Sequence, residues 1–131
     1  MAPPFRMYGG GDGMLFHIAT SADWEGYQAA GEIRPASLAA EGFVHASLAG
    51  QVLGTAGRHF AGREDLVLVA LDPGRLGAEV VFEDLYGRGE ALPHVYGPIP
   101  LGAVVGVGAL RLEEGSRFVW PAGVPRGNMA P

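Results

Sequence analysis

A run of apolar residues between two aspartates constrains the fold of this chain more than any other segment. Residues 65–72 read Asp-Leu-Val-Leu-Val-Ala-Leu-Asp, so every position between the two ends is apolar. The side chains of a strand alternate between the two faces of its sheet, and a face that meets water normally carries polar residues. We therefore predict a central strand covered on both faces, with other elements packed above and below it.

Two shorter apolar runs each carry one histidine. Residues 14–19 alternate as a strand with His17 on one face, and residues 43–47 do the same with His45. A single histidine on a strand is often a structural residue, because a neutral imidazole with both nitrogens hydrogen-bonded costs little to bury. Two of them on like strand faces instead favour a shared pocket.

Helices are predicted after each of these strands. Thr20 or Ser21 caps a helix over residues 22–30, and Gly31 ends it. Residues 32–41 are then expected to cross the surface.

Ser47, which shares a strand face with His45, is expected to cap a second helix over residues 48–60. A helix that begins there aims backbone N–H groups toward the neighbourhood of His45. Such an end suits an anion, including a phosphate.

Two more strands are predicted in the second half of the chain. Residues 79–83 alternate with Glu83 on a carboxylate-bearing face, and residues 103–112 form a final strand. Between them, His94 and Tyr96 lie in a Pro-rich segment that presents its side chains with little entropy left to lose.

The chain of 131 residues fits one core. The elements predict a single α+β domain with a curved or split antiparallel or mixed sheet and two flanking helices. Residues 14–112 form this domain, residues 1–13 a flexible N-terminal segment and residues 113–131 a Pro/Gly-rich tail. The tail contains Phe118-Val119-Trp120, which can dock on the domain or on a partner.

Composition narrows the function. The formal net charge is −5 and every basic residue is an arginine, scattered rather than clustered in a stripe, which argues against duplex nucleic acid as a partner. The absence of cysteine excludes a disulfide, a thiolate nucleophile and a cysteine metal ligand. No apolar run is long enough for a signal peptide or a membrane span, so a cytoplasmic protein with a small-molecule partner is expected.

The residues resemble a known bacterial family. Six segments recur in order with similar spacing in the family called domain of unknown function 952, and they cover most of the chain from about residue 14 to 110. These segments are Leu15-Phe16-His17-Ile18-Ala19, Ser37-Leu38, Glu41-Gly42-Phe43-Val44-His45-Ala46-Ser47, Gln51-Val52, Asp65-Leu66-Val67-Leu68 and Pro93-His94-Val95-Tyr96-Gly97-Pro98.

A more distant similarity carries more chemistry. The two histidine strands, the helix that contains Thr55-Ala56-Gly57-Arg58-His59 and the apolar strand after it look like the catalytic half of the RNA 2′-phosphotransferases, which share the ADP-ribosyltransferase fold and use NAD. The resemblance implies that His17 and His45 contact ribose hydroxyls in a nicotinamide-dinucleotide pocket. The half that supplies the phosphotransferases' catalytic arginines is absent, and Ile18-Ala19 replaces a glycine-threonine pair. These departures argue against phosphotransfer itself, and they make the NAD assignment an analogy at the level of fold.

Transfer from NAD breaks the ribose–nicotinamide bond through an oxocarbenium-like state. A carboxylate near the sugar and neutral donors on its hydroxyls favour this reaction. Glu83, and after it Glu90, are the candidate carboxylates, and His17 and His45 are the candidate imidazoles. Together with Ser47 near a phosphate, and with His94 and Tyr96 closing the pocket, these residues predict an NAD-dependent ADP-ribosyltransferase-like or other glycosyl-transferring enzyme.

Two alternatives use the same residues. His17, His45, His94 and Glu83 are suitable ligands for zinc or another first-row metal, in a metal-binding protein or a hydrolase. A non-catalytic nucleotide-binding or interaction module would bind without releasing nicotinamide. His59, beside Phe60 on the outer side of its helix, is expected to be a solvated surface residue.

Overall fold

A computed structural model describes residues 5–6, 13–114 and 116–126 of the chain. The flexible segment expected over residues 1–13 lies almost entirely outside these described residues, as does the end of the C-terminal tail. The described residues form a single α+β domain in which all strand pairs are antiparallel.

A three-stranded sheet forms the centre of the domain. Its order is β2 (Leu15–Thr20), β5 (Leu66–Leu71) and β9 (Val104–Ala109), so the apolar run between the two aspartates is the middle strand, as predicted. Leu66, Leu68 and Ala70 contribute to one apolar cluster, whereas Val69 and Leu71 contribute to another on the opposite face. The central strand is therefore covered on both sides.

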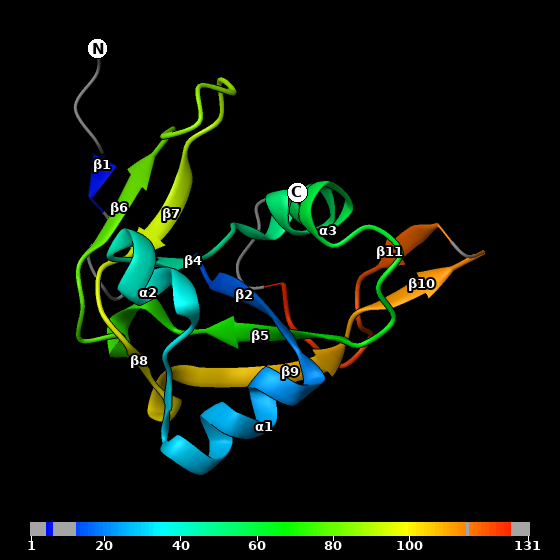
Figure 1. Ribbon diagram of the computed structural model, residues 1–131, viewed down its shortest axis with the longest axis horizontal. Helices are drawn as coiled ribbons and strands as arrows, with labels where there is room; N and C mark the ends of the chain where they lie inside the picture. The colour runs from blue at the N-terminus through cyan, green and yellow to red at the C-terminus, as the bar shows by residue number, and fades with distance from the viewer. Residues whose placement is uncertain (1–4, 7–12, 115, 127–131) are drawn as a thin grey trace.

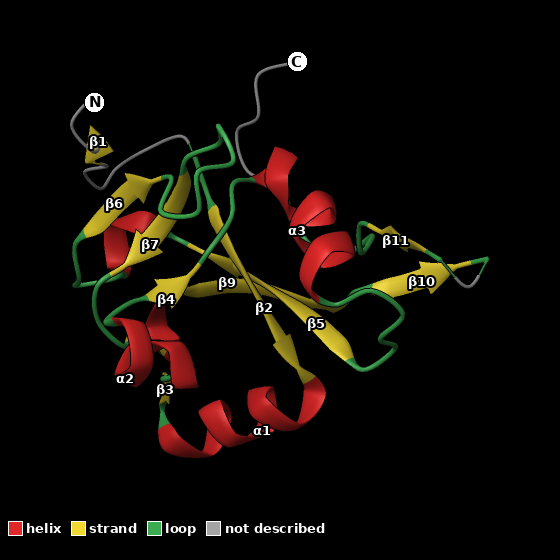
Figure 2. Ribbon diagram, turned by 45° about the horizontal axis from the view of Figure 1, so that its top comes forward, coloured by secondary structure: helices red, strands yellow, loops and turns green. Residues whose placement is uncertain are grey.

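The two faces of this sheet are covered by different elements. Helix α1 (Ser21–Ala30) packs on the face of Val69, where Tyr27 is buried, and helix α3 (Val52–His59) packs on the opposite face through Val52 and Ala56. Figures 1 and 2 show the two helices on opposite sides of β2 and β5. The alternation along β2 accordingly separates Leu15 and Ala19 from Phe16, as the sequence predicts.

A second sheet continues the first across a sharp bend. Its order is β1 (Phe5–Arg6), β6 (Val80–Glu83), β7 (Leu92–Val95) and β4 (Val44–His45). Phe16 of β2 and Ser47 join the sheets through two backbone hydrogen bonds of 2.9 and 2.8 Å. The split sheet expected from the sequence is confirmed, and the strand predicted over residues 43–47 is the segment that crosses the split.

Short two-stranded pairs complete the architecture. They are β3 (Glu32–Ile33) with β8 (Ile99–Pro100), and β10 (Arg111–Glu113) with β11 (Arg117–Val119). The final strand predicted over residues 103–112 thus breaks into β9 and β10. In the C-terminal segment, Phe118 is buried and Trp120 packs edge-on against Phe16, so this segment docks on the domain.

The helix boundaries confirm one prediction and correct two. Thr20 caps α1 by accepting from the N–H of Asp23, and Gly31 ends the helix in the left-handed conformation, both as predicted. Residues 32–41, predicted as a surface loop, contain helix α2 (Ala36–Glu41). The missing signal is apolar periodicity, because this six-residue helix buries no residue completely.

The second correction concerns Ser47, which does not cap a helix. The chain after it forms a 3-10 turn (Ala49–Gln51), and α3 begins only at Val52. The side chain of Gln51 accepts from the N–H of Leu48, which satisfies the donor expected to face an anion. Glycines at positions 50, 54 and 57 lower the helix propensity of this segment. Two further 3-10 turns are Pro73–Arg75 and Leu101–Ala103.

No helix among the described residues is both long and apolar enough to cross a membrane.

Candidate functional site

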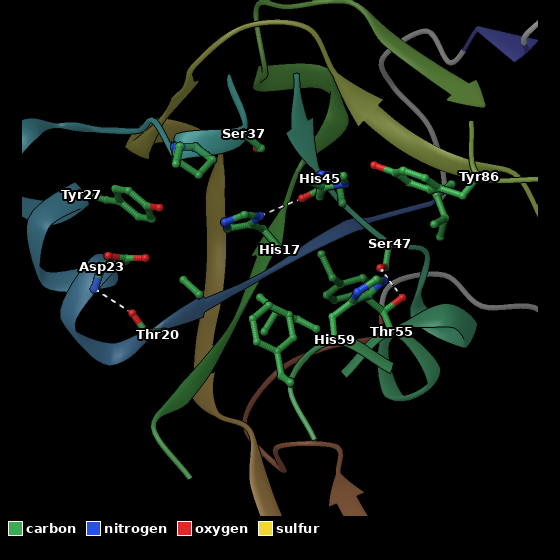
Figure 3. A pocket seen from close by; sticks show the side chains of 18 of the residues that line it. His17, Thr20, Asp23, Tyr27, Ser37, His45, Ser47, Thr55, His59 and Tyr86 are labelled. Atoms are coloured by element: carbon green, nitrogen blue, oxygen red, sulfur yellow. Dashed lines mark hydrogen bonds between the residues drawn. The ribbon is translucent and has the colours of Figure 1, made fainter. Parts of the chain in front are cut away.

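A cleft of about 510 Å³ opens beside the junction of the two sheets. Strand β2 forms its floor, α1 and the start of α2 form one side, and α3 with the loop between β6 and β7 forms the other (Figure 3). Pockets of this volume accommodate small organic ligands. The cleft is the candidate functional site, and both His17 and His45 line it.

His17 has one ring nitrogen fixed by the backbone. Its Nδ1 lies 2.7 Å from the carbonyl oxygen of His45, and because a carbonyl only accepts, Nδ1 carries the proton. Burial lowers the pKa of His17, against the effect of this hydrogen bond, so the ring is neutral. Nε2 is then an acceptor that hydrogen-bonds to no described residue and is available to a ligand in the cleft.

The wall opposite His17 carries two polar groups from α1. Asp23 and Tyr27 are four residues apart and so lie on one face of the helix, and both line the cleft. Figure 3 shows the Tyr27 ring directed toward His17. Burial and then the charge of Asp23 raise the pKa of Tyr27, which keeps the phenol protonated. Sequence reasoning missed both residues as site candidates, although their spacing and their closeness to His17 in the chain were available signals.

The ring of His45 faces a different set of partners. Its Nε2 lies 2.9 Å from Oε1 of Glu41, and the Tyr86 hydroxyl donates to Oε2 of the same carboxylate at 2.9 Å. The hydrogen bond from His45, followed by that from Tyr86, lowers the pKa of Glu41. The sequence did not single out Glu41 or Tyr86. They meet at His45 because α2 ends at Glu41 and the 84–90 loop folds over it.

Glu83, His94 and Tyr96, with Phe43, form a separate group that we call the Glu83–His94 cluster. Nδ1 of His94 lies 3.0 Å from Oε1 of Glu83, which also accepts from the Tyr96 hydroxyl at 2.5 Å. Phe43 stacks on the His94 ring with centroids 4.0 Å apart. These side chains share a face of the second sheet, since β7 pairs with both β4 and β6.

Burial and hydrogen bonds shift the pKa values of His94 and Tyr96 in this cluster. His94 is 0% exposed, and its Nε2 is buried and hydrogen-bonds to no described residue. Burial lowers the pKa of His94 although the Glu83 hydrogen bond opposes this shift. The bond to Glu83 raises the pKa of Tyr96 to about 12, so its phenol remains protonated at neutral pH.

The structure therefore divides the predicted site residues into two groups. His17, His45 and Ser47 line the cleft, whereas Glu83, His94 and Tyr96 are not among its lining residues. His17 meets the backbone of His45 rather than its ring, and the His45 ring lies 5.5 Å from that of His94. His94 and Tyr96, expected to close the same pocket, and Glu83, the expected carboxylate, therefore do not line this cleft. The register of β4, β7 and β6 places them in a different sheet from His17.

The metal alternative finds no geometric support. Among the described residues, no group of three or more histidine, aspartate or glutamate side chains is arranged to hold a metal ion. His17 Nδ1 is occupied by a carbonyl, and the free Nε2 atoms of His17 and His94 belong to the two separate groups.

The remaining candidates lie at the α3 end of the cleft or outside it. Ser47 donates to the Thr55 hydroxyl at 3.3 Å instead of capping a helix. His59 is exposed, as predicted, but it also lines the cleft, which the sequence did not indicate. Glu90 pairs with Arg58 at 3.4 Å and does not line the cleft.

Comparison with known proteins identifies relatives of this arrangement. A family model described as "Protein of unknown function (DUF952)" matches residues 18–107. The crystal structure of protein CC0527 from Caulobacter crescentus is similar, with 30% identity, a TM-score of 0.72, and coverage of 81% of this chain and 93% of that one. The solution NMR structure of CC0527 gives 29% identity, a TM-score of 0.62, and coverage of 79% and 90%. No curated protein matches the chain.

Proposed function

The chain belongs to the DUF952 family, and because the description of that family assigns no activity, we propose a function from the cleft: it binds NAD or a related nucleotide with a ribose against His17. One observation carries this proposal. The His45 carbonyl fixes the tautomer of His17, so that a neutral imidazole presents an unoccupied Nε2 acceptor inside an open cleft.

A ribose diol suits the polar groups at this end. His17 Nε2 accepts from one hydroxyl, and the Tyr27 phenol and the Asp23 carboxylate supply a donor and an acceptor from the facing helix (Figure 3). A neutral imidazole held in one tautomer binds a hydroxyl without introducing a charge. The aromatic rings of Phe60 and Tyr86, which also line the cleft, provide apolar surface for a base.

The likeness of the two histidine strands to the catalytic half of the RNA 2′-phosphotransferases, which use NAD, supports NAD as the nucleotide. This support is analogy at the level of fold. The residues present fit the ribosyl part of NAD, since the cleft offers a neutral acceptor, a phenol and a carboxylate around one position. When bound, NAD would supply a glycosidic bond that can break with nicotinamide as the leaving group, so that the ADP-ribosyl group passes to a nucleophile.

The activity we propose is transfer of the ADP-ribosyl group, and Asp23 is the carboxylate that faces the sugar. Asp23 lines the cleft beside Tyr27, whose pKa is raised by burial and then by the Asp23 charge. The same charge is the smallest of the effects on His17, where it opposes the lowering of the pKa by burial. A carboxylate in this position stabilises the positive charge that develops on the ribose. Glu83, the residue favoured by the sequence, does not line the cleft and instead binds His94 and Tyr96.

Calorimetry with NAD, ADP-ribose and nicotinamide tests the binding step. His17→Asn is the sharpest variant, because asparagine retains an N–H for the His45 carbonyl and removes Nε2. We expect it to weaken NAD binding by about five- to tenfold, as for the loss of one hydrogen bond in a cleft. No heat from any of the three ligands, or unchanged NAD affinity in His17→Asn, would overturn the proposal.

A matched pair of tyrosine variants controls for general effects. Tyr27→Phe removes a hydroxyl from the cleft, and Tyr96→Phe removes one from the Glu83–His94 cluster. Only Tyr27→Phe is expected to weaken NAD binding. Chromatographic detection of free nicotinamide then separates the two classes of function. Release that is lost in Asp23→Asn supports the transferase, and binding without release supports a non-catalytic module.

A further inference from the structure

The two ends of the cleft differ in charge. Asp23 is the only carboxylate among the described residues that line it, and it lies at the α1 end with Thr20 and Tyr27. The opposite end is lined by His59 and Arg88, together with the hydroxyls of Ser47 and Thr55. Figure 3 shows Asp23 and Tyr27 on one side of His17 and the Ser47, Thr55 and His59 side chains on the other. The cleft is therefore polarised along its length.

Arg88 is the only arginine among the described residues that line the cleft, and like Arg111 and Arg126 it has no carboxylate partner among the described residues. Five of the described arginines form ion pairs with carboxylates, namely Arg34, Arg58, Arg63, Arg75 and Arg117. Arg88 forms none with any described carboxylate, and its guanidinium lies 5.7 Å from the centroid of the Tyr86 ring. An arginine without a carboxylate partner at the wall of a cleft is available to an anionic ligand.

The loop that carries Arg88 is held in place by its own hydrogen bonds. The carboxylate of Asp84 accepts from the backbone N–H groups of Arg88 and Gly89 at 2.9 and 2.7 Å, so it is engaged with the backbone rather than with the guanidinium. The Tyr86 hydroxyl is bound to Glu41. Arg88 is thus presented from a restrained loop, which reduces the entropy lost when a ligand binds.

The neighbourhood of His59 shows the same positive potential. Burial lowers the pKa of His59, and the charges of Arg88, Arg58 and His45 lower it further. A neutral His59 donates a hydrogen bond from one ring nitrogen, as the Ser47 and Thr55 hydroxyls can from their oxygens. These groups surround the region with donors and carry no negative charge.

We propose that the His59–Arg88 end of the cleft binds the phosphate ester of the ligand, so that the substrate class is a phosphorylated nucleoside oriented with its ribose at His17 and its phosphate at Arg88. This inference rests on the proposed function and deepens it. Arg88 acts as the specificity residue, since its bidentate guanidinium matches phosphate oxygens, and the Asp23 end disfavours the same group by repulsion.

Inorganic pyrophosphate, titrated by calorimetry without a metal ion, tests the phosphate subsite independently of any ribose. We expect Arg88→Gln to weaken pyrophosphate binding about tenfold, as for the loss of a charge-assisted pair. Arg75→Gln is the matched control, because it makes the same change in net charge at an arginine that pairs with Asp72 away from the cleft. Unchanged affinity in Arg88→Gln, or an equal loss in Arg75→Gln, overturns the subsite.

NMR of the His59 ring locates the anion. Pyrophosphate bound at this end is expected to raise the pKa of His59, because a nearby negative charge favours the imidazolium, and to leave the ring signals of His94, which does not line the cleft, unchanged. A pKa of His59 that does not move during saturation with pyrophosphate places the anion elsewhere and contradicts the proposal.

Comparison of ligands with and without phosphate separates this inference from the proposed function. Nicotinamide riboside and NAD are expected to lose affinity alike in His17→Asn, whereas Arg88→Gln affects only NAD. If NAD binds but Arg88→Gln leaves its affinity intact, the subsite fails and the proposed function stands. If pyrophosphate binds through Arg88 but NAD does not bind, the proposed function fails and the phosphate comes from another phosphorylated compound.

Discussion

The cleft around His17 and the Glu83–His94 cluster are built from the same parts. Each has an imidazole on a strand, each uses Nδ1 to bind an oxygen, and burial lowers the pKa of both rings. They differ in what lies beyond the ring. Nε2 of His17 meets an open cleft, whereas Nε2 of His94 is sealed in the interior. A histidine on a strand therefore produces in one place a ring that can bind a ligand in the cleft and in the other a ring that no ligand in the cleft can reach.

The two histidines also differ in the group that accepts the hydrogen bond from Nδ1. His17 donates to a neutral carbonyl, so a ligand at Nε2 meets an uncharged ring with no carboxylate behind it. His94 donates to the carboxylate of Glu83, whose side chain is only 15% exposed and which also holds Tyr96. A polar network of this kind rigidifies the structure around it when its hydrogen bonds are made. We infer that the cluster supports the wall that carries His45.

Truncation of His94 is expected to produce the largest effect on stability. His94→Ala removes a fully buried ring that stacks on Phe43 and leaves Glu83 with one partner fewer, so the free energy of unfolding should fall by about 2–4 kcal/mol. His17→Ala should cost about 1–2 kcal/mol, because water from the cleft can enter the space left by the ring. Urea denaturation measures both values.

His59→Ala is the control for this comparison. His59 is exposed on α3, and alanine favours a helix, so the substitution should change the free energy of unfolding by less than about 0.5 kcal/mol. Equal losses for His17→Ala and His94→Ala would contradict the distinction between an open and a sealed ring.

His17 and His94 should both contribute to the pH dependence of the free energy of unfolding. The pKa values of His17 and His94 are lowered in the folded state, so below pH 6.5 the unfolded chain takes up protons that the folded chain does not. Stability is therefore complete above pH 6.5 and falls as the pH decreases toward the folded pKa values. The slope is at most about 1.4 kcal/mol per pH unit for each histidine.

Glutamine variants assign this slope to the two rings. His17→Gln and His94→Gln each remove one titrating histidine. In each variant, the free energy of unfolding should therefore change less between pH 7 and pH 5 than in the original protein. Saturating NAD then separates them, because a hydroxyl bound at Nε2 should lower the pKa of His17 further and leave that of His94 unchanged. Equal shifts of the two pKa values on NAD binding would contradict the separation of the cleft from the Glu83–His94 cluster.

Much of the fold followed from side-chain periodicity. The apolar run at residues 65–72 predicted the covered middle strand, and the alternation along β2 predicted which of its residues face each cluster. Helix α2 escaped detection because it is short and begins after Pro35 without a side-chain cap. It is held by tertiary contacts that no local pattern records, including Leu38 against the apolar cluster that contains Val69 and Leu71, and it ends at the left-handed Gly42.

The site was predicted only where it depended on strand faces. His17 and His45 both line the cleft, but the sequence could not show that the two lie in different sheets and meet through a carbonyl. Glu83 was placed on a carboxylate-bearing face correctly, yet strand register directs that face toward His94. Register between distant strands is set by the packed core, so the sequence alone could not show that Glu83 lies outside the cleft.

Two tyrosine variants should give the smallest and most discriminating effects. Tyr96 and Tyr86 are similarly exposed, and each donates its hydroxyl to a glutamate, but the side chain of Glu83 is 15% exposed and that of Glu41 is 38% exposed. Because a less solvated acceptor gains more from a hydrogen bond, Tyr96→Phe should cost about 1 kcal/mol and Tyr86→Phe less than about 0.5 kcal/mol. Urea denaturation measures both, and ultraviolet titration should lose the tyrosine with a pKa of about 12 only in Tyr96→Phe.

A double-mutant cycle with Glu83→Gln isolates the hydrogen bond itself. Equal losses of stability in Tyr96→Phe and Tyr86→Phe would show that Glu83 is as well solvated as Glu41. The Glu83–His94 cluster would then behave as exposed surface, and there would be no physical reason to treat it as a rigid support.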